Sequence, residues 1–288
     1  MKIRTALPLL LALSAGGHAA DTDDFAAKIV QLEQKKQARI GVAVTDQAGR
    51  TVLGHRENER FALCSTFKLP LVAQVLWRID QGREKSSRPL AYNVDALQEY
   101  APVARRYAPS GYMTVQEASL AALQWSDNTA ANLLLDTLGG PAGFTRFVRQ
   151  NGDSTTRLDR PEPDLNSNQP DDPRDTTTPL AMSRLTSRLL WGNTLRPATR
   201  QQLQRWLIGN STGDTTIRAG LPAGWLAGEK TGSCELGGRN DAGFVRSPAG
   251  KNHALAIYTL APQLEPKERD ALIAETARLV TAQLEPQK

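Results

Sequence analysis

The sequence predicts a two-domain α/β (α+β) fold in which one antiparallel sheet is built from both ends of the chain. Strand-like segments occur near both ends, while the middle has helical periodicity and loops. Strands on both sides of a helical middle favour one sheet with flanking helices and an inserted helical domain. At 288 residues, 40% hydrophobic and 23% charged, the chain can bury one large core or two adjoining ones.

Residues 1–20 have the pattern of a secretory signal peptide. Lys2 and Arg4 precede an apolar run that is too short to span a bilayer, and small residues follow it. We expect cleavage after Ala19 or Ala20 and a periplasmic location. Removal of this segment takes away two basic residues and no acidic ones, so the net charge falls from +5 to +3.

The first elements expected in the mature chain are a helix and a hairpin. Apolar side chains recur on one helical face of residues 21–36. Residues 38–46 have strand character, and residues 51–55 return after a turn at 47–50 that contains glycine. This hairpin supplies the N-terminal part of the sheet.

The middle of the chain is expected to be helical, apart from one long loop. An apolar run from Leu69 to Trp77 predicts a buried helix, and Pro70 is tolerated in its first turn. Further helices are expected at 113–125, 129–138, 141–151, 179–191 and 197–209. Residues 153–178 hold several prolines and no periodicity, and a loop of this length is usually functional or disordered.

The C-terminal part is expected to complete the sheet. Strands are predicted at 225–232, 240–246 and 254–260, and a final helix at 265–284. We therefore expect a sheet domain of residues 21–63 and 214–288, and an all-α domain of residues 64–213 that contains an omega-type loop at 157–178.

Ser65 and Lys68 are the first candidate reactive pair. On one face of a helix, side chains three residues apart can meet. A serine hydroxyl is a weak nucleophile until a base takes its proton. A lysine with a lowered pKa can be that base. Ser-x-x-Lys alone occurs by chance in most long chains, so it needs support from other motifs.

Three further motifs follow in order: Ser126-Asp127-Asn128 between two helices, Glu162–Asn166 in the long loop, and Lys230-Thr231-Gly232 at a strand end. Singly, they have ordinary explanations as a helix cap, a solvated turn and a strand end. With Ser65-x-x-Lys68, they resemble the motif set of the class A serine β-lactamases. The resemblance covers nearly the whole mature chain and implies the serine β-lactamase/transpeptidase-like fold.

The resemblance implies hydrolysis of the β-lactam amide bond through a serine acyl-enzyme, and thus resistance to β-lactam antibiotics. Ser65 would be the nucleophile, Lys68 would help to deprotonate it, and Ser126 would pass a proton to the departing ring nitrogen. Glu162, with Asn166, would hold the water that attacks the acyl-enzyme. Whether Lys68 or Glu162 is the base for acylation stays open.

The resemblance also assigns the substrate-binding groups. Lys230, Thr231 and Arg239 would bind the substrate carboxylate, with Gly232 completing the motif. Thr216 stands where some carbapenemases carry an arginine, and Arg239 is expected to supply that charge.

The remaining groups would surround the reacting amide. Asn128 would hold the side-chain amide of the substrate, and Tyr100 would stand at the pocket mouth. The backbone N–H groups of Ser65 and Ser233 would form the oxyanion hole.

Two pairs of residues are expected to hold the walls of the site. Arg160 and Asp175 match the ion pair that fixes the omega-type loop in the family. Two cysteines in an exported protein favour a disulfide over two free thiols, and Cys64 and Cys234 are the only cysteines. Their place beside Ser65 and Ser233 resembles that of the class A carbapenemases.

The resemblance is strongest to the GES-type carbapenemase subgroup. It rests on the stretches 205–210, 228–232 and 237–241. We therefore expect carbapenems among the substrates.

We expect no metal, cofactor or nucleic acid, and a monomer that is not bound to a membrane after signal cleavage. His55 and His253 are isolated, and no run of five basic residues occurs. Two alternatives stay open: a penicillin-binding DD-peptidase and a non-enzymatic β-lactam sensor domain. Glu162, Asn166 and the absence of a membrane segment argue against them.

Overall fold

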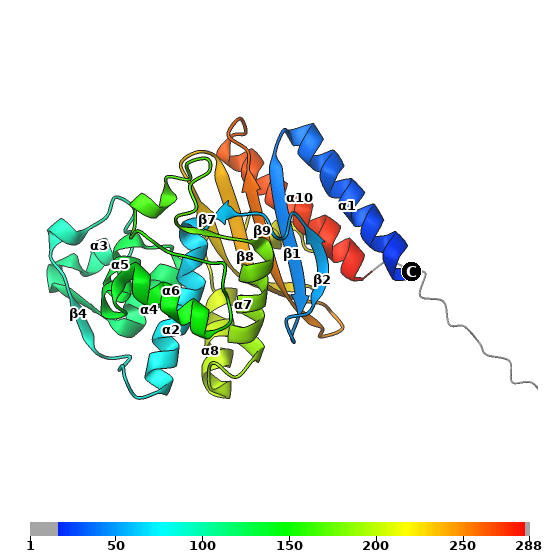
Figure 1. Ribbon diagram of the computed structural model, residues 1–288. Helices are drawn as coiled ribbons and strands as arrows, with labels where there is room; N and C mark the ends of the chain where they lie inside the picture. The colour runs from blue at the N-terminus through cyan, green and yellow to red at the C-terminus, as the bar shows by residue number, and fades with distance from the viewer. Residues whose placement is uncertain (1–16, 286–288) are drawn as a thin grey trace, which may run out of the picture.

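The computed structural model describes residues 17–285, with side chains from residue 24 onward. A five-stranded antiparallel sheet lies between two groups of helices (Figure 1). The strand order is β2-β1-β9-β8-β7. These strands are β1 (Arg39–Asp46), β2 (Thr51–His55), β7 (Leu226–Ser233), β8 (Gly238–Arg246) and β9 (Asn252–Leu260). The predicted sheet built from both ends of the chain is confirmed, and β7 is one of its edges.

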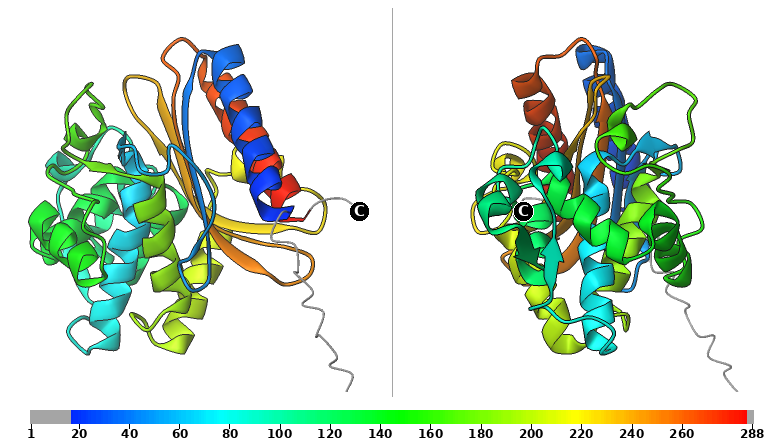
Figure 2. Two further views of the ribbon diagram at one scale, coloured as in Figure 1. Left: turned by 45° about the vertical axis from the view of Figure 1, so that its right-hand side comes forward. Right: turned by 90° about the vertical axis from the view of Figure 1, so that its left-hand side faces the viewer.

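Helices from the two ends of the chain cover one face of the sheet. They are α1 (Gly17–Lys36) and α10 (Pro266–Leu284), which lie side by side in both figures (Figures 1 and 2). Ile29 of α1 and Ile273 of α10 belong to a core cluster with Val42 of β1 and Ile257 of β9. Terminal segments far apart in sequence are thus joined through one hydrophobic core.

The other face of the sheet is covered by the helical part of the chain. Its main helices are α2 (Lys68–Asp80), α4 (Val115–Gln124), α5 (Asn128–Thr137), α6 (Gly140–Gln150), α7 (Pro179–Trp191) and α8 (Pro197–Ile208). Because side chains alternate along a strand, β9 sends Ala256 and Tyr258 into this core and Leu255 into the core on the opposite face. Both faces of the sheet are therefore buried.

The shorter elements connect these layers. They are β3 (Phe61–Ala62), η1 (Cys64–Phe67), β4 (Pro89–Ala91), η2 (Val94–Ala96), α3 (Ala104–Tyr107), η3 (Ala108–Ser110), β5 (Tyr112–Thr114), η4 (Asp164–Asn166), β6 (Thr176–Thr177) and α9 (Ile217–Gly220). Strand β3 pairs with β6, so the end of the long loop is tied to the segment just before η1.

The helix predicted to start at Met113 starts at Val115 instead. Thr114 is its N-cap and forms a capping box with Glu117, which fixes the helix start. Met113 belongs to β5, which pairs with β4. The middle of the chain therefore contains a two-stranded ribbon that the helical prediction did not include.

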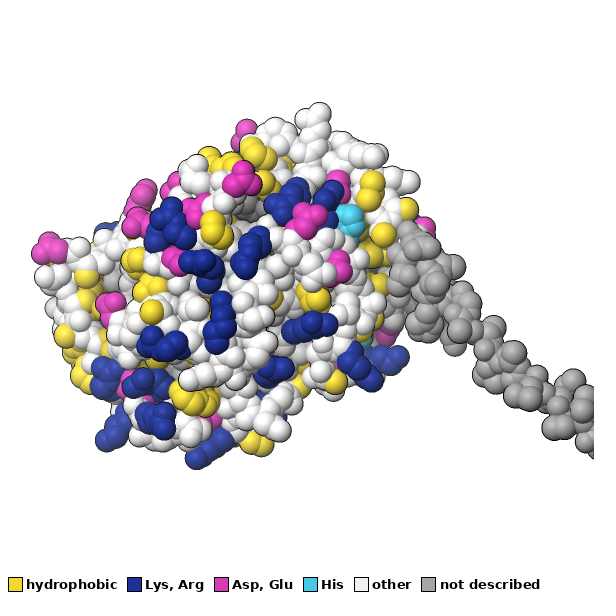
Figure 3. Space-filling model, viewed as in Figure 1, with side chains coloured by type: hydrophobic (Ala, Val, Ile, Leu, Met, Phe, Trp, Pro, Cys, Tyr) yellow, Lys and Arg dark blue, Asp and Glu magenta, His cyan; other side chains and the backbone are white. Residues whose placement is uncertain are grey.

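Three observations concern the predicted signal peptide, membrane-spanning helices and the surface charge. The first sixteen residues of the predicted signal peptide, 1–20, lie outside the described residues. Within the described residues, no helix has the length and apolar character needed to cross a membrane. Lys and Arg side chains are spread over the face seen in Figure 3, with acidic side chains among them, rather than gathered in one block.

Candidate active site

Ser65 lies in the short 3-10 turn η1, directly before α2 begins at Lys68. Cys64 starts this turn in the left-handed region, with φ +45°. Thr66 anchors the turn because its hydroxyl donates to the Leu63 carbonyl at 2.6 Å. The change from 3-10 to α-helix places Lys68 Nζ 2.9 Å from Ser65 Oγ. The side-chain contact predicted from the three-residue spacing is present.

The Lys68 side chain is fully buried and surrounded by acceptors. Its Nζ donates to the Ser126 carbonyl at 2.8 Å and to Asn128 Oδ1 at 2.6 Å. It also lies 2.8 Å from Glu162 Oε1. Burial lowers the pKa of Lys68 below its usual range, and the charge of Glu162 partly offsets this effect. A buried amine with a lowered pKa beside a hydroxyl has the properties of a base.

Glu162 reaches the same point from the long loop. Its Oε1 accepts a hydrogen bond from Ser65 Oγ at 3.3 Å, and its Oε2 accepts one from Asn166 Nδ2 at 2.5 Å. Glu162 precedes Pro163 through a cis peptide bond. The carboxylate therefore lies between the hydroxyl of Ser65 and the amide of Asn166.

Asn132 positions Glu162, and the sequence reading missed it. Its Oδ1 accepts from the Glu162 backbone N–H at 3.0 Å, and its Nδ2 donates to the Glu162 carbonyl at 2.9 Å. Asn132 lies four residues after Asn128 on α5, so both project from one side of the helix, Asn128 toward Lys68 and Asn132 toward Glu162. The spacing places Asn132 on that side of the helix but does not indicate which segment it contacts.

The Ser126–Asn128 segment is held by its middle residue. Asp127 caps α5 through the Ala130 N–H at 2.8 Å, and its other oxygen accepts from the N–H groups of Val103 and Ala104. Ser126 is in the left-handed region at φ +57°, so the backbone turns sharply there. The helix cap predicted from Ser-Asp-Asn is therefore present and also orients its two neighbours toward Lys68.

Lys230 on the edge strand β7 completes the polar centre. Its Nζ donates to Ser126 Oγ at 3.1 Å and to the Thr231 carbonyl at 2.7 Å. Burial lowers the pKa of Lys230 well below its usual range, and the charge of nearby Lys68 lowers it further. Ser126 is thus contacted by both lysines, by Lys68 at its backbone carbonyl and by Lys230 at its hydroxyl.

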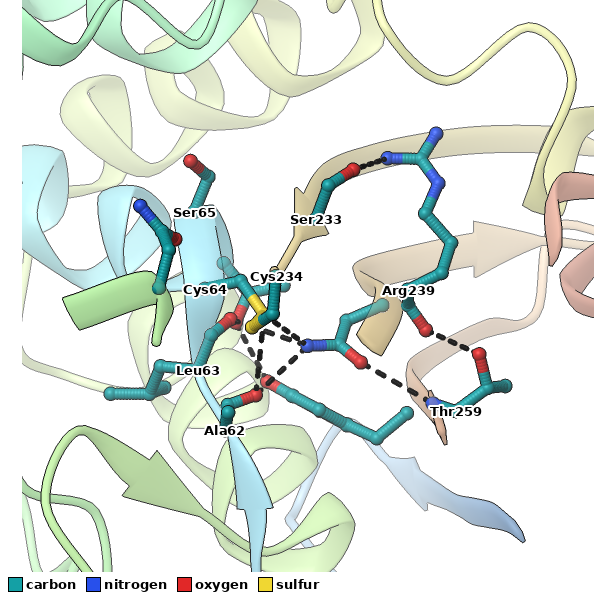
Figure 4. Close-up of a disulfide and its surroundings, with 12 residues drawn as sticks. Ala62, Leu63, Cys64, Ser65, Ser233, Cys234, Arg239 and Thr259 are labelled. Carbon is teal, nitrogen blue, oxygen red and sulfur yellow. Dashed lines mark hydrogen bonds between the residues drawn. A yellow bond between two sulfur atoms is a disulfide. The ribbon is translucent and has the colours of Figure 1, made fainter. Parts of the chain in front are cut away.

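Arg239 lies across the hairpin from Ser233, as Figure 4 shows. Its Nη1 donates to Ser233 Oγ at 3.0 Å, and its Nε donates to Asp270 Oδ1 at 2.6 Å. Asp270, on α10, was not singled out from the sequence. Thr216 is fully buried and donates its hydroxyl to Asp241 at 2.6 Å.

A disulfide joins Cys64 and Cys234, with their Cα atoms 5.6 Å apart (Figure 4). It links the turn η1, which carries Ser65, to the residue after Ser233. The strand comes so close here that a Cβ on Gly232 would lie 3.1 Å from the backbone nitrogen of Ser65. Asn240, which the sequence reading missed, adds a hydrogen bond from its Nδ2 to the Ala62 carbonyl at 2.8 Å.

The long loop and the pocket mouth hold the last predicted residues. Arg160 Nε donates to Asp175 Oδ2 at 2.6 Å, so the two ends of the loop are paired. The other Asp175 oxygen accepts from the N–H groups of Asp159 and Arg160. Tyr100 is 53% exposed, and its carbonyl accepts from the Asn128 N–H at 3.0 Å.

The arrangement can perform acyl transfer. A serine hydroxyl lies within hydrogen-bond reach of both an amine and a carboxylate. A second buried lysine, Lys230, contacts the hydroxyl of Ser126, whose backbone carbonyl accepts from Lys68. In the described part of the chain, no group of His, Cys, Asp and Glu side chains could hold a metal ion.

Comparison with known proteins supports this chemistry. Residues 24–284 match the family described as the β-lactamase enzyme family. The chain is 41% identical to the β-lactamase OXY-2 of Klebsiella oxytoca over 279 residues, which is 97% of this chain and 95% of that protein. It is 44% identical to the carbapenem-hydrolyzing β-lactamase KPC of Klebsiella oxytoca over 284 residues, which is 97% of each chain.

The solved structures agree. A class A β-lactamase reconstructed as the last common ancestor of Gram-negative bacteria superimposes with a TM-score of 0.88 at 49% identity, covering 91% of this chain and 99% of that one. The putative class A β-lactamase PenP of Rhodopseudomonas palustris gives a TM-score of 0.87 at 41% identity, covering 90% of this chain and 99% of that one.

Proposed function

The chain belongs to the class A β-lactamases, which hydrolyse β-lactams, and we propose that it does so through an acyl-enzyme on Ser65. One observation carries the proposal. Within a buried site, Ser65 Oγ lies 2.9 Å from Lys68 Nζ and 3.3 Å from Glu162 Oε1. Either group can take the hydroxyl proton as the oxygen attacks the β-lactam carbonyl.

Acylation breaks the ring amide. Ser65 Oγ bonds to the carbonyl carbon, and its proton passes to Lys68 or Glu162. The backbone N–H groups of Ser65 and Ser233 stabilise the oxyanion, and one such donor is typically worth about 2.7–4 kcal/mol of barrier. As the C–N bond breaks, Ser126 gives its proton to the ring nitrogen and recovers one from Lys68, which returns the proton taken from Ser65 either directly or by way of Glu162. Lys230 Nζ, 3.1 Å from Ser126 Oγ, donates a hydrogen bond to the serine oxygen during this transfer.

Deacylation uses Glu162. The carboxylate takes a proton from a water, the resulting hydroxide attacks the ester carbonyl, and Ser65 Oγ leaves and recovers a proton. Asn166 Nδ2 fixes the carboxylate from one side at 2.5 Å. General-base assistance is worth about 10²–10⁴ in rate. A DD-peptidase would acylate but would lack this fast second step.

Substrate recognition uses basic and polar side chains of strands β7 and β8. Lys230, Thr231 and Arg239 bind the substrate carboxylate, with Gly232 allowing close approach of the strand to Ser65. Asn128 binds the side-chain amide of the substrate, and Tyr100 borders the mouth. Asp270 holds Arg239 toward Ser233, so the guanidinium is already oriented before substrate arrives.

The proposed substrates include carbapenems as well as penicillins and cephalosporins. Two observations support this range: the disulfide that joins both walls of the acylation site, and the 44% identity to a relative named as carbapenem-hydrolyzing. A GES-like arrangement is part of the proposal, with Arg239 supplying the charge that Thr216 lacks. The test is imipenem hydrolysis followed by loss of ultraviolet absorbance. Catalytic turnover supports the proposal, whereas a stable adduct without turnover refutes it.

The biological setting is also a proposal. We propose that the protein acts in the periplasm as a monomer after removal of residues 1–20. We propose that residues 21–63 and 214–288 form one domain and residues 64–213 the other. The site then lies between them, because Ser65, Lys68 and Ser126 come from one domain and Lys230 from the other. Size-exclusion chromatography of the periplasmic fraction tests the location and the oligomeric state together.

A further inference from the structure

The Thr231 hydroxyl is part of a hydrogen-bonded chain that leads away from the reacting groups. Its Oγ1 lies 2.5 Å from Thr212 Oγ1, and this is its only hydroxyl partner among the described residues. Thr212 Oγ1 in turn donates to Asn210 Oδ1 at 2.9 Å. Thr212 and Asn210 lie in the segment between α8 and α9, and neither residue has a part in the catalytic steps.

The direction of this chain follows from the donors and acceptors. The Thr212 backbone N–H points to the same Asn210 atom at 3.1 Å, so that atom must be the carbonyl oxygen, which only accepts. The Thr212 hydroxyl has one hydrogen and gives it to Asn210. It therefore accepts from Thr231, whose own single hydrogen points away from the substrate pocket.

Asn210 is fixed in this orientation by a buried carboxylate. Its Nδ2 donates to Glu229 Oε1 at 3.1 Å, and Asn210 is only 2% exposed. Arg218 donates from Nε to Glu229 Oε2 at 3.2 Å and from Nη1 to the backbone carbonyl of Asn210 at 2.7 Å. A side chain at Gly213 would overlap the Glu229 carboxylate, so glycine is required for this packing. The amide of Asn210 therefore cannot turn over without losing these contacts.

We propose that Thr212 is a positioning residue whose hydroxyl reverses when a substrate carboxylate binds. This proposal rests on the proposed role of Thr231 in carboxylate binding. In the free enzyme, Thr231 donates to Thr212 and Thr212 donates to Asn210. When a carboxylate arrives, Thr231 rotates its hydrogen onto the anion, and Thr212 rotates its own hydrogen onto Thr231 Oγ1.

The reversal keeps every group paired. Asn210 Oδ1 retains the Thr212 backbone N–H, and Thr231 Oγ1 retains a partner while it donates to the substrate. A hydroxyl that accepts a hydrogen bond is a stronger donor, so Thr212 strengthens the bond to the carboxylate. The Thr212 hydroxyl therefore stabilises the bound substrate and the transition state equally. This stabilisation requires an anionic substrate.

The test compares Thr212→Val, which keeps the shape but removes the hydroxyl, with the control Thr212→Ser, which keeps the hydroxyl. One lost hydrogen bond corresponds to about a 3- to 10-fold effect. We expect Thr212→Val to raise KM for benzylpenicillin by that factor with kcat within about twofold of wild type. We expect the Ser variant to match wild type.

Benzylpenicillin methyl ester separates this role from a general disturbance of the site. It lacks the anion, so its kcat/KM should be the same in wild type and Thr212→Val. An unchanged benzylpenicillin KM in Thr212→Val would overturn the inference, as would an equal loss for the ester. Either result would leave β-lactam hydrolysis by the wild-type enzyme intact. An inactive wild type would instead refute the proposed function.

Discussion

Glu162 and Lys68 form a fully buried ion pair in which Oε1 and Nζ are 2.8 Å apart. Both groups also contact Ser65 Oγ, the proposed nucleophile. Breaking a buried pair by removing one partner leaves the other charge unpaired, which is strongly destabilising unless its protonation changes. In the proposed mechanism, the pair therefore takes part in both acylation and deacylation.

Glu162→Ala is expected to trap the acyl-enzyme. Lys68 remains beside Ser65 and can still support acylation, but the hydrolytic water loses its base. We expect deacylation to slow by about 10²–10⁴. Intact-protein mass spectrometry after mixing with benzylpenicillin should show an adduct that persists for minutes or longer. Clearance at the wild-type rate would remove Glu162 from this role.

Asn132→Ala is expected to slow deacylation more than acylation, because Asn132 holds both backbone groups of Glu162. The lost hydrogen bonds should lower the free energy of unfolding by about 1–3 kcal/mol. The burst and steady-state phases of nitrocefin hydrolysis separate the two steps. Thr137→Ala on the same helix, whose hydroxyl bonds only to the Leu134 carbonyl among the described residues, is the control. Equal slowing of both phases would contradict a role through Glu162.

Cys64→Ser is expected to reduce both stability and carbapenem turnover. The disulfide spans 170 residues, for which the chain-entropy model gives about 5 kcal/mol as an upper figure. Thiol titration of the denatured, unreduced wild type should find no free thiol. Imipenem turnover should fall more than nitrocefin turnover. We expect the imipenem acyl-enzyme to stall when its carbonyl is no longer held by the displaced oxyanion hole. Cys234→Ser should behave in the same way, and a difference between the two variants would assign the effect to one side chain rather than to the bond.

Lys230→Met is expected to flatten the pH dependence of stability. Burial lowers the pKa of Lys230 in the folded protein, so below pH 10.5 the unfolded chain binds more protons. The free energy of unfolding of the wild type should therefore rise with pH toward that value, by at most about 1.4 kcal/mol per pH unit from this residue.

Urea unfolding at pH 7.5 and pH 9.5 measures this difference. The wild type should gain more stability than Lys230→Met between the two values. The other titrating groups are common to both proteins and largely cancel in the comparison. An equal gain would show that the Lys230 pKa is not lowered in the folded state.

Much of the fold was predictable because local patterns and packing agree. Strand β2 and helix α7 have the predicted bounds, since apolar periodicity and flanking turn residues coincide there. The start of α4 was missed because the apolar Met113 extends the helical pattern, while the Thr114 capping box sets the true start. Where a capping residue lies within an apolar run, the cap rather than the apolar periodicity determines where the helix starts.

Those residues of the site that belong to short sequence motifs could be predicted. Ser65 and Lys68 could be paired from their spacing, because one helical turn brings them together. Asn132, Asp270 and Asn240 could not be identified in this way. Each acts on a segment far away in sequence, and a single polar residue on a helix or strand carries no signal of what it will contact.

The most direct test of the account is the site of acylation. Wild-type protein and Ser65→Ala are each mixed with benzylpenicillin, quenched within seconds, digested and analysed by peptide mass spectrometry, with nitrocefin turnover measured in parallel. We expect a transient penicilloyl adduct on the peptide that contains Ser65, and neither adduct nor turnover in Ser65→Ala. An adduct on another residue, or wild-type turnover in Ser65→Ala, would contradict the assignment of Ser65 as the nucleophile.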